Sequence, residues 1–365
     1  MTPLNRRTFV SLGAAVTAAP LLAALPASGS ATQAATEPSI RLNYNESPLG
    51  PSPLAREAMR KAVDLSGFYH YEQQGQLVQL FARQNDLPVP RVRAFSGSRE
   101  ALQYALCAFT KPGSLVLATP TYDAPAIAAR QQNLKVHEVP LTAEHAHDIP
   151  GMLAAGTDAG LFYLCNPNNP TGTLTSRQGI ERLVAEKPAH AVVVIDEAYI
   201  HFSDAQSCLD LASTRNDVIV LHTFSKLYGM AGARLGLAVG HPDLLARMRL
   251  FGGGNFIPVG ASLGGIASLR DADLVPQRKH LNAQVREQSM AWFASRGLST
   301  TRSHCNCFMV DLRQPAQPIV DALAQHKVLV GRVWPNWPDW MRITVGSAND
   351  MSALHRAFAA VTAKT

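Results

Sequence analysis

Between about residue 90 and residue 240 the chain alternates between short apolar runs and stretches with helical spacing. The apolar runs lack the polar alternation of a half-exposed strand, which favours strands that are buried on both faces. These runs cover residues 115–119, 161–165, 191–195, 218–222 and 235–239. Helical stretches lie between them, at 99–110, 122–132 and 176–186. Repeated strand–helix units predict an α/β fold with a mostly parallel sheet and helices on both faces.

The pattern changes near residue 276. A long helix is predicted over 275–296, followed by strand-like runs at 308–311, 328–333 and 341–345. Ser347 and Asp350 have the spacing of a capping box before a final helix at 350–362. We therefore expect a large domain over 70–275, a smaller α/β domain over 276–365, and an N-terminal segment, 37–69, that joins the small domain.

The first 36 residues differ in composition from the rest. Two adjacent arginines, Arg6 and Arg7, precede a weakly apolar alanine and leucine stretch, and small residues near 31–34 offer cleavage sites. The segment resembles a bacterial twin-arginine signal, which predicts export to the periplasm by the twin-arginine machinery after folding. It is short and interrupted for a membrane span. An ordinary secretory signal, an uncleaved membrane anchor and a cytoplasmic location are the alternatives.

Length and charge favour a two-domain globular protein and argue against a nucleic-acid-binding protein. The chain has 365 residues, of which 47% are hydrophobic, enough for a large core and for two domains. The formal net charge is +6, but lysine and arginine form no runs and no nucleic-acid motif is present. We expect a mildly basic surface that favours anionic small molecules, and no nucleic-acid partner.

Cysteine and histidine usage indicates neither a disulfide framework nor a metal site. The five cysteines are odd in number and irregularly spaced. Cys305 and Cys307 are two residues apart, where a strained bridge is conceivable but free thiols are favoured. The twelve histidines show no ligand spacing, so we expect no metal.

The most informative motif is the run from Thr223 to Lys226. It places one amine after the hydroxyls of Thr223 and Ser225, and Arg234 follows eight residues later. Such an amine suits a Schiff base with an aldehyde cofactor, while hydroxyls and a guanidinium suit a phosphate. Taken alone, the motif is better explained by a solvated lysine after a strand.

Two further motifs precede this lysine in the order that a pyridoxal phosphate site needs. Asn169 and Asp196, like Lys226, follow predicted strands, and parallel strands bind ligands at their carboxyl ends. A buried Asp196 needs a partner, which a protonated pyridine nitrogen would provide. A surface aspartate or a magnesium ligand is the alternative, although no phosphate-binding nucleotide loop is present. Tyr199 and Asn169 can donate to the cofactor's phenolic oxygen, and Tyr122 can stack on its ring.

Other polar positions suit a phosphate and a substrate carboxylate. Gly97, Ser98 and Arg99 precede a predicted helix, whose N-terminus favours a phosphate, although a simple serine cap also explains them. Arg342 lies inside an apolar strand, where it is costly unless it is paired with a substrate carboxylate or an internal acid. Arg332 is a second candidate for anionic substrate groups, or a solvated strand end.

Together with the run 42–52 (LNYNESPLGPS), these motifs resemble the fold-type I pyridoxal-phosphate-dependent aminotransferases of class I/II. The histidinol-phosphate aminotransferase branch is the most similar, from about residue 40 to the C-terminus. The resemblance implies a homodimer that moves an amino group between an L-amino acid, or a related amine, and a 2-oxo acid. A decarboxylase or C–S lyase on the same fold is the nearer alternative, and a non-catalytic periplasmic binding protein is the more distant one.

The resemblance also implies roles for single residues. Lys226 attaches the cofactor and moves a proton, Asp196 pairs with the ring nitrogen, and Tyr199 and Asn169 contact the phenolic oxygen. The phosphate is surrounded by Gly97, Ser98, Arg99, Thr223, Ser225 and Arg234, with Tyr71 reaching the site of the other subunit. The substrate is contacted by Arg342, Arg332, Tyr44 and Asn169. A tryptophan-rich stretch, 333–340, departs from the branch, so we expect a substrate other than histidinol phosphate.

Overall fold

The computed structural model describes residues 39–252 and 256–363. The predicted export signal over 1–36 lies outside these residues. The described residues belong to one compact unit, Ser39–Thr365, so the division into a large and a small domain near residue 275 stays a prediction. Within the described ranges, no helix is long and apolar enough to cross a membrane.

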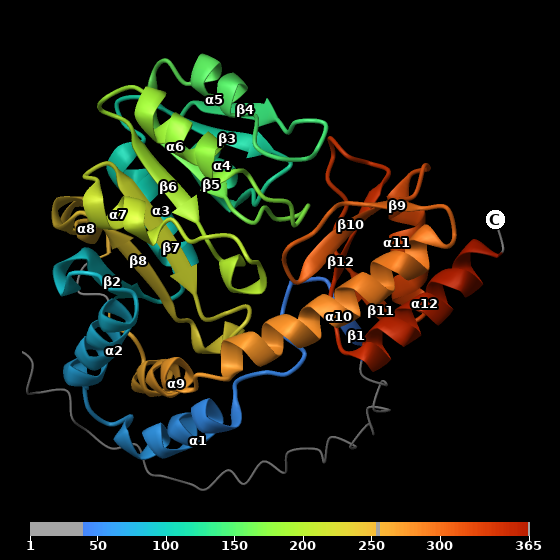
Figure 1. Cartoon of the computed structure of the whole chain (residues 1–365), viewed down its shortest axis with the longest axis horizontal. Coiled ribbons are helices and arrows are strands. Elements are labelled where there is room, and N and C mark those ends of the chain that lie inside the picture. Colours follow the sequence, from blue (N-terminus) through green and yellow to red (C-terminus); the bar gives the residue numbers. More distant parts are fainter. Residues whose placement is uncertain (1–38, 253–255, 364–365) are drawn as a thin grey trace, which may run out of the picture. The chain divides into compact units, whose positions relative to one another are not determined.

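A seven-stranded sheet forms the largest layer (Figure 1). Its strands, in spatial order, are β2 (Val92–Phe95), β8 (Gly236–Gly240), β7 (Val218–Thr223), β6 (Val192–Asp196), β5 (Ala159–Cys165), β3 (Ser114–Thr119) and β4 (Val136–Pro140). The strands from β7 to β4 are parallel, which confirms the mostly parallel sheet. The predicted strand at 235–239 is present as β8 but runs antiparallel, because the connection from β7 contains only a 3₁₀ turn, Ala231–Ala233, and no crossover helix.

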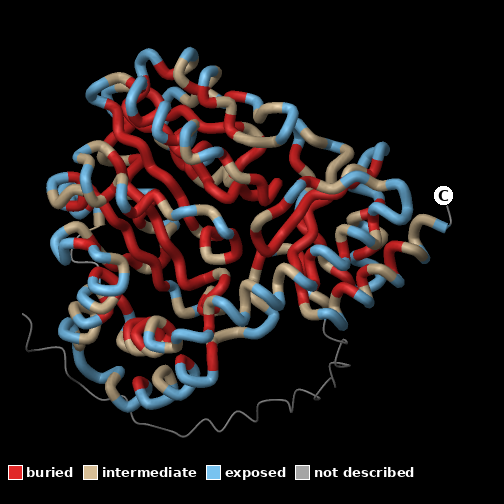
Figure 2. Tube along the Cα trace, in the orientation of Figure 1, coloured by how far each residue is buried: buried red, intermediate tan, exposed pale blue. Residues whose placement is uncertain are grey.

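Helices cover both faces of this sheet, and alternate strand residues pack on opposite sides. One face packs against α2 (Tyr71–Gln84), α5 (Ile149–Ala155), α6 (Arg177–Glu186), α7 (Leu209–Thr214) and α9 (Val259–Arg270). The other packs against α3 (Ser98–Phe109), α4 (Ala124–Gln131) and α8 (Pro242–Arg249). Val193 belongs to the first core and Val194 to the second, so β6 is buried on both sides, as Figure 2 shows for the central strands.

The C-terminal part contains a smaller sheet with its own core. The antiparallel strands β9 (Ser299–Thr300), β10 (Cys307–Asp311) and β12 (Trp340–Thr344) pack with α10 (Leu274–Ala294), α11 (Ala316–Gln325) and α12 (Ala348–Thr362). The predicted capping box of Ser347 and Asp350 is confirmed at the start of α12. The predicted strand 328–333 is too long: β11 ends at Val330, where the Gly331 amide donates to the Arg342 carbonyl at 2.8 Å.

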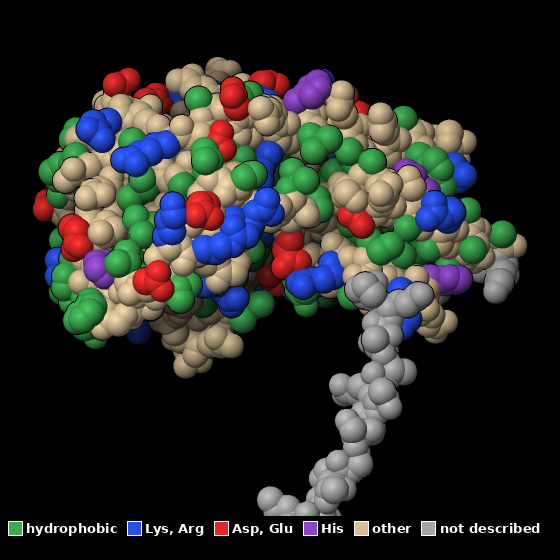
Figure 3. All heavy atoms as spheres, turned by 90° about the horizontal axis from the view of Figure 1, so that it is seen from below, with side chains coloured by type: hydrophobic (Ala, Val, Ile, Leu, Met, Phe, Trp, Pro, Cys, Tyr) green, Lys and Arg blue, Asp and Glu red, His purple; other side chains and the backbone are tan. Residues whose placement is uncertain are grey.

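The N-terminal segment contributes one strand of a separate two-stranded sheet and one helix that packs on another helix. β1 (Ile40–Leu42) pairs in parallel with β11, and α1 (Pro53–Lys61) packs against α9. All five cysteines are free thiols, with the Sγ atoms of Cys305 and Cys307 3.3 Å apart. On the face seen in Figure 3, basic and acidic side chains are interspersed.

Candidate active site

One cavity of about 930 Å³ collects nearly all of the predicted site residues. It lies where the carboxyl ends of β5, β6 and β7 meet the N-terminal segment and the ends of β11 and β12. The predicted residues that line it are Tyr44, Ser98, Arg99, Tyr122, Asn169, Asp196, Tyr199, Thr223, Ser225, Lys226, Arg234, Arg332 and Arg342. The rule that placed Asn169, Asp196 and Lys226 at one sheet edge is therefore confirmed.

Lys226 lies just beyond β7 and its Nζ donates to the carbonyl oxygen of Tyr44 at 2.9 Å. Burial lowers the pKa of this amine to about 8, and the positive charge of Arg342 acts in the same direction. A lysine with a lowered pKa is more often neutral near neutral pH, which is the form that attacks an aldehyde or accepts a proton.

Asp196 is the last residue of β6 and is buried. Its Oδ2 accepts from the Tyr163 hydroxyl at 3.0 Å and its Oδ1 from the Ala198 amide at 3.2 Å. Burial raises the pKa of this carboxyl to about 6. Among the described residues it forms no ion pair, so a protonated ring nitrogen would provide the missing opposite charge. Sequence analysis missed Tyr163 because it lies within an uninterrupted apolar run.

A cradle for a phosphate forms at the N-terminus of α3. Gly97 is its N-cap residue with φ 88°, and a Cβ at this position would lie 2.2 Å from Nη2 of Arg234. Thr223 donates to the Ser225 hydroxyl at 3.0 Å, and Nη1 of Arg234 donates to the same oxygen at 3.5 Å. A helix N-terminus, two hydroxyls and a guanidinium thus converge, and this set of donors fits a phosphate.

Asn45 joins the N-terminal segment to both sheets and was not predicted. Its Nδ2 donates to the Tyr199 hydroxyl at 3.1 Å, to Oδ1 of Asn169 at 3.4 Å and to the Cys307 sulfur at 3.2 Å. Its Oδ1 accepts from the Thr344 hydroxyl at 3.0 Å. Asn45 therefore positions the two groups that were expected at the phenolic oxygen. A loop asparagine with φ 52° carries no periodic signal that would reveal this.

Arg342 is buried on β12 and makes hydrogen bonds to neutral acceptors only. Nη1 donates to Oδ1 of Asn169 at 2.8 Å, and Nη2 donates to the carbonyl oxygen of Asn43. Among the described residues it has no carboxylate partner. A Cβ at Gly331 would lie 2.7 Å from its Nε, so the guanidinium lies against bare backbone. An uncompensated buried guanidinium is suited to bind a carboxylate in a bidentate manner.

Arg332 also lines the cavity, but it is already paired. Its Nη2 lies 2.5 Å from Oδ2 of Asp123, and its guanidinium lies 4.7 Å from the centre of the Trp334 ring. Both Asp123 and Trp334 line the same cavity and were not predicted as site residues. This end of the cavity is thus close to charge neutrality.

Tyr71 does not join the other predicted residues within the chain. It begins α2 outside the cavity, and its half-exposed ring contacts Tyr69 at 5.7 Å and Phe256 at 4.7 Å between centroids. A role for Tyr71 in the site of a second subunit stays a prediction.

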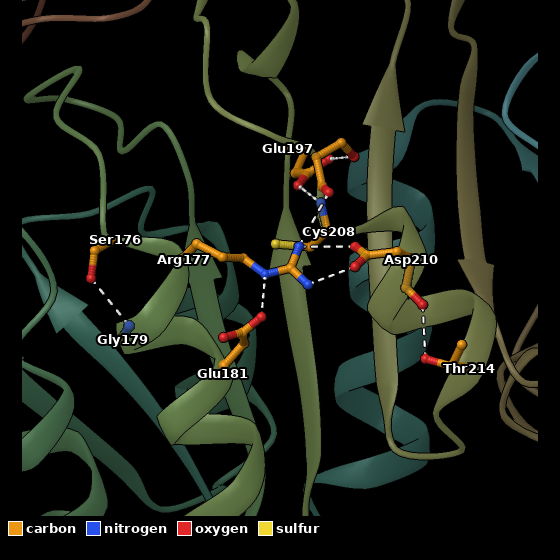
Figure 4. A network of polar contacts seen from close by, with 9 residues as sticks. Ser176, Arg177, Gly179, Glu181, Glu197, Cys208, Asp210 and Thr214 are labelled. Atoms are coloured by element: carbon orange, nitrogen blue, oxygen red, sulfur yellow. Dashed lines mark hydrogen bonds and ion pairs between the residues drawn. The ribbon is translucent and has the colours of Figure 1, made fainter.

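Glu197 follows Asp196 but turns to the opposite side of the sheet, toward α7 (Figure 4). Its carboxylate accepts from the Cys208 amide at 2.6 Å, the Ser207 hydroxyl at 2.5 Å and Nε2 of His222 at 2.8 Å. Glu197 is fully buried and does not line the cavity. Its polar contacts hold the start of α7 against the sheet.

Comparison with known proteins agrees with this geometry. The family model for aminotransferase class I and II matches residues 37–361. Histidinol-phosphate aminotransferase 2 of Pseudomonas fluorescens is 32% identical, with 89% of each chain covered. A crystal structure from Erwinia carotovora atroseptica gives a TM-score of 0.85 at 30% identity, covering 90% of this chain and 99% of that one.

A second solved structure contains the predicted cofactor. Histidinol-phosphate aminotransferase from Sinorhizobium meliloti, in complex with pyridoxal-5'-phosphate, gives a TM-score of 0.81 at 26% identity. The alignment covers 89% of this chain and 90% of that one. With the family match over 37–361 and the pattern of residues in the cavity, the chain belongs to the aminotransferase class I and II family.

Proposed function

We propose that this aminotransferase moves an amino group between an L-amino acid, or a related amine, and a 2-oxo acid, with Lys226 as the proton-transferring base. The observation that carries the proposal is the lowered pKa of Lys226, about 8, in the same cavity as the buried Asp196. An amine that loses its proton readily beside a buried acid suits acid–base chemistry at a substrate carbon.

Pyridoxal phosphate is the cofactor, and when bound it supplies an aldehyde for the amine and a ring that accepts electrons. In our proposal Asp196 holds the ring nitrogen, Tyr199 and Asn169 contact the phenolic oxygen, and Tyr122 covers the ring. The groups proposed to hold the phosphate are Gly97, Ser98, Arg99, Thr223, Ser225 and Arg234. In support, each of these residues lines the cavity, except Gly97, which lies directly behind Arg234.

The remaining residues orient the substrate. Arg342 binds its α-carboxylate, while Asn169 fixes the guanidinium through the 2.8 Å hydrogen bond. Lys226 Nζ removes the proton from Cα and later returns it. Asn45 holds the Tyr199 hydroxyl in place, because its amide bridges Tyr199 and Thr344. Orientation of the Cα–H bond decides between transamination and decarboxylation or elimination.

The decisive variant is Lys226→Ala. We expect it to lose both the visible absorbance of the bound cofactor and transamination, since no other lysine lines the cavity within the described residues. Lys135→Ala is the control, because Lys135 is exposed and pairs with Asp158 at 2.8 Å. Wild-type activity in Lys226→Ala would refute the proposal.

A single incubation separates transamination from the other reactions of this cofactor. Wild-type protein is supplied with a panel of L-amino acids and 2-oxoglutarate, and 2-oxo acid, carbon dioxide and released thiol are measured. We expect new 2-oxo acid that matches the glutamate formed. Carbon dioxide or thiol without glutamate would instead indicate the decarboxylase or the C–S lyase.

We further propose a homodimer. Its support is a group of exposed aromatic side chains that line one hollow, namely Phe68, Tyr69, Tyr71 and Phe256, because an exposed apolar patch often marks a protein interface. Sedimentation should give twice the chain mass, and Tyr71→Phe should weaken cofactor binding. A monomer that binds the cofactor normally would refute this role.

We also propose that residues 1–36 direct export of the folded protein through the twin-arginine machinery, on the sequence pattern alone. Replacing Arg6 and Arg7 by lysine should keep the protein in the cytoplasm of a bacterial host, as measured by cell fractionation. Unchanged distribution between the compartments would favour an ordinary secretory signal, an anchor or a cytoplasmic enzyme.

A further inference from the structure

We infer that Asp123 determines the choice of amino donor: its carboxylate pairs with the guanidinium of Arg332 inside the cavity, and this favours donors whose side chain carries no negative charge. The inference rests on the proposed function and adds the class of substrate. It concerns two residues that line the cavity which holds Lys226, one directly before α4 and one just after β11.

The cations that line the cavity differ in what is left for them to bind. In the proposed function, Arg99 and Arg234 lie at the phosphate, Lys226 at the aldehyde and Arg342 at the α-carboxylate. These partners are the same for every amino acid that the enzyme accepts. Arg332 is the remaining cation among the described residues that line the cavity. It is therefore the charge that can distinguish the side chain of one donor from that of another.

Arg332 is not left free to bind an anion. Its Nη2 lies 2.5 Å from Oδ2 of Asp123, and both residues line the cavity. The side chain of Asp123 is 35% exposed and that of Arg332 is 52% exposed, so a ligand in the cavity can reach both groups. A carboxylate or phosphate on the donor's side chain would meet the Asp123 carboxylate where it would bind the guanidinium. Like charges brought together in this way oppose binding.

The Asp123 carboxylate is not used to cap the helix that follows it. Asp123 is the N-cap residue of α4, a position where an aspartate side chain usually accepts from an amide of the first turn. Its side chain makes no such hydrogen bond. Among the described residues, Arg332 is its partner. The acid is therefore held by the arginine and not by the helix.

The ion pair lies within reach of a donor that is bound at the α-carboxylate site. The centre of the Trp334 ring lies 5.3 Å from the guanidinium carbon of Arg342 and 4.7 Å from that of Arg332. The two guanidinium groups are thus no farther apart than these two distances together. One amino acid can meet Arg342 with its α-carboxylate and Arg332 with its side chain.

The two segments that carry the ion pair are also tied to each other by a neutral contact. Nδ2 of Asn336 donates to the Thr119 hydroxyl at 3.0 Å. Asn336 lies four residues after Arg332, and Thr119 lies four residues before Asp123. Arg332 should therefore stay near the cavity when the charge of Asp123 is removed. A charge that is already in place discriminates better than one on a free loop.

The test compares donors that differ in charge but hardly in shape, namely L-glutamate against L-glutamine and L-aspartate against L-asparagine. Enzyme loaded with pyridoxal phosphate is mixed with each donor, and the loss of the cofactor's visible absorbance gives the second-order rate constant without an amino acceptor. We expect wild type to use the amide of each pair about tenfold better than the acid.

Asp123→Asn keeps the shape of the side chain but removes its charge, so the ratio of acid to amide should rise about tenfold. The double variant with Arg332→Gln should lose this gain, because the freed guanidinium is the group that binds the acid. Glu46→Gln is the matched control. It removes another acid that lines the cavity, but one that is paired with Arg41 at 2.8 Å, and the ratio should change less than about threefold.

A binding measurement repeats the comparison without a reaction. Calorimetry with glutarate and glutaramate should show the same shift of about tenfold toward the dicarboxylate in Asp123→Asn. It decides the inference for any donor pair that does not react. Recovery and thermal unfolding show whether each variant is folded, and Asp123→Ser replaces Asp123→Asn if the amide is not.

Four results would overturn the inference. They are a wild-type preference for the acids, an unchanged ratio in Asp123→Asn, a gain that persists in the double variant, and an equal gain in Glu46→Gln, which would point to the net charge of the cavity. These outcomes leave the proposed function standing. A wild-type enzyme that transaminates no donor would instead refute the proposed function, while the calorimetry still decides on Asp123.

Discussion

Asp196 and Glu197 are adjacent acids at the end of β6, yet their carboxylates face opposite sides of the sheet and differ in their hydrogen-bond partners. Glu197 faces α7 and is satisfied by an amide, a hydroxyl and a histidine. Asp196 faces the cavity, has only neutral donors from Tyr163 and Ala198, and burial raises its pKa to about 6. Alternation along a strand separates the two faces. The acid that is incompletely satisfied by the protein is the one positioned for a ligand, while the satisfied acid supports the fold.

The largest expected effect is that of Asp196→Asn on activity. The amide is nearly isosteric but cannot balance a positive ring nitrogen, so kcat/KM should fall about 10³-fold while the protein still folds. Steady-state kinetics and circular dichroism measure the two effects. A loss of less than tenfold would mean that both acids at the end of β6 are structural.

Glu197→Gln should show the opposite pattern. One amide NH₂ would face donors that now point at a carboxylate oxygen, so the free energy of unfolding should fall by about 3 kcal/mol. Turnover per folded molecule should change less than threefold, because Glu197 lies outside the cavity. Denaturant unfolding and active-site titration provide the numbers. A large loss of turnover in fully folded Glu197→Gln protein would contradict the conclusion that Glu197 supports only the fold.

The stability of the cofactor-free protein should depend on pH through Asp196. Its carboxyl has a pKa of about 6 in the fold and 3.8 as its ordinary value. A raised acid pKa stabilises the fold below pH 3.8, and that contribution is lost as the pH rises from about 4 to 6, by ~3 kcal/mol at most.

The difference in unfolding free energy between wild type and Asp196→Asn isolates this effect. His201 and His147, with pKa values lowered by burial to about 3 and about 4, destabilise the fold in acid instead, and they titrate alike in both proteins. If the difference in unfolding free energy did not change between pH 4 and 7, the raised pKa of the Asp196 carboxyl would be contradicted.

The smallest effect on stability is expected for Arg177→Ala. Arg177 lies at the surface, on the side of the sheet that Glu197 faces. Arg177 pairs with Asp210 at 2.6 Å and with Glu181 at 2.8 Å, and both acids are half-exposed (Figure 4). Solvent weakens such pairs, so unfolding free energy should fall by about 0.5–1 kcal/mol, with no change in kinetics. If the free energy of unfolding fell by several kcal/mol instead, these surface ion pairs would belong to the polar contacts that stabilise the fold around Glu197.

The sequence predicted those parts of the site that depend on local order. Asp196 ends a buried run, Lys226 and Asn169 follow closely after two others, and the carboxyl ends of parallel strands must meet at one edge. The antiparallel direction of β8 and the end of β11 at Val330 were missed, because they depend on the route of the connecting chain rather than on apolar runs.

The residues that sequence analysis missed owe their roles to distant partners. Asn45 contacts Thr344 across 299 positions, and Tyr163 is an ordinary strand residue until Asp196 lies beside it. Trp334 was expected only as part of a stretch that shapes substrate choice. Asp123 carries no motif of its own, and its pairing with Arg332 is visible only in the folded chain.

Gly331 sets a limit on how far this substrate pocket can be redesigned. Its missing side chain leaves the space in which Arg342 lies, with a Cβ only 2.7 Å from Nε. Even an alanine at this position would push the guanidinium away from its neighbours, whatever amino acid the enzyme accepts. Engineering of donor preference should therefore leave Gly331 unchanged, because it makes room for the arginine that would bind the carboxylate common to all donors. Substitutions should begin at Arg332 and continue to the residues that follow it.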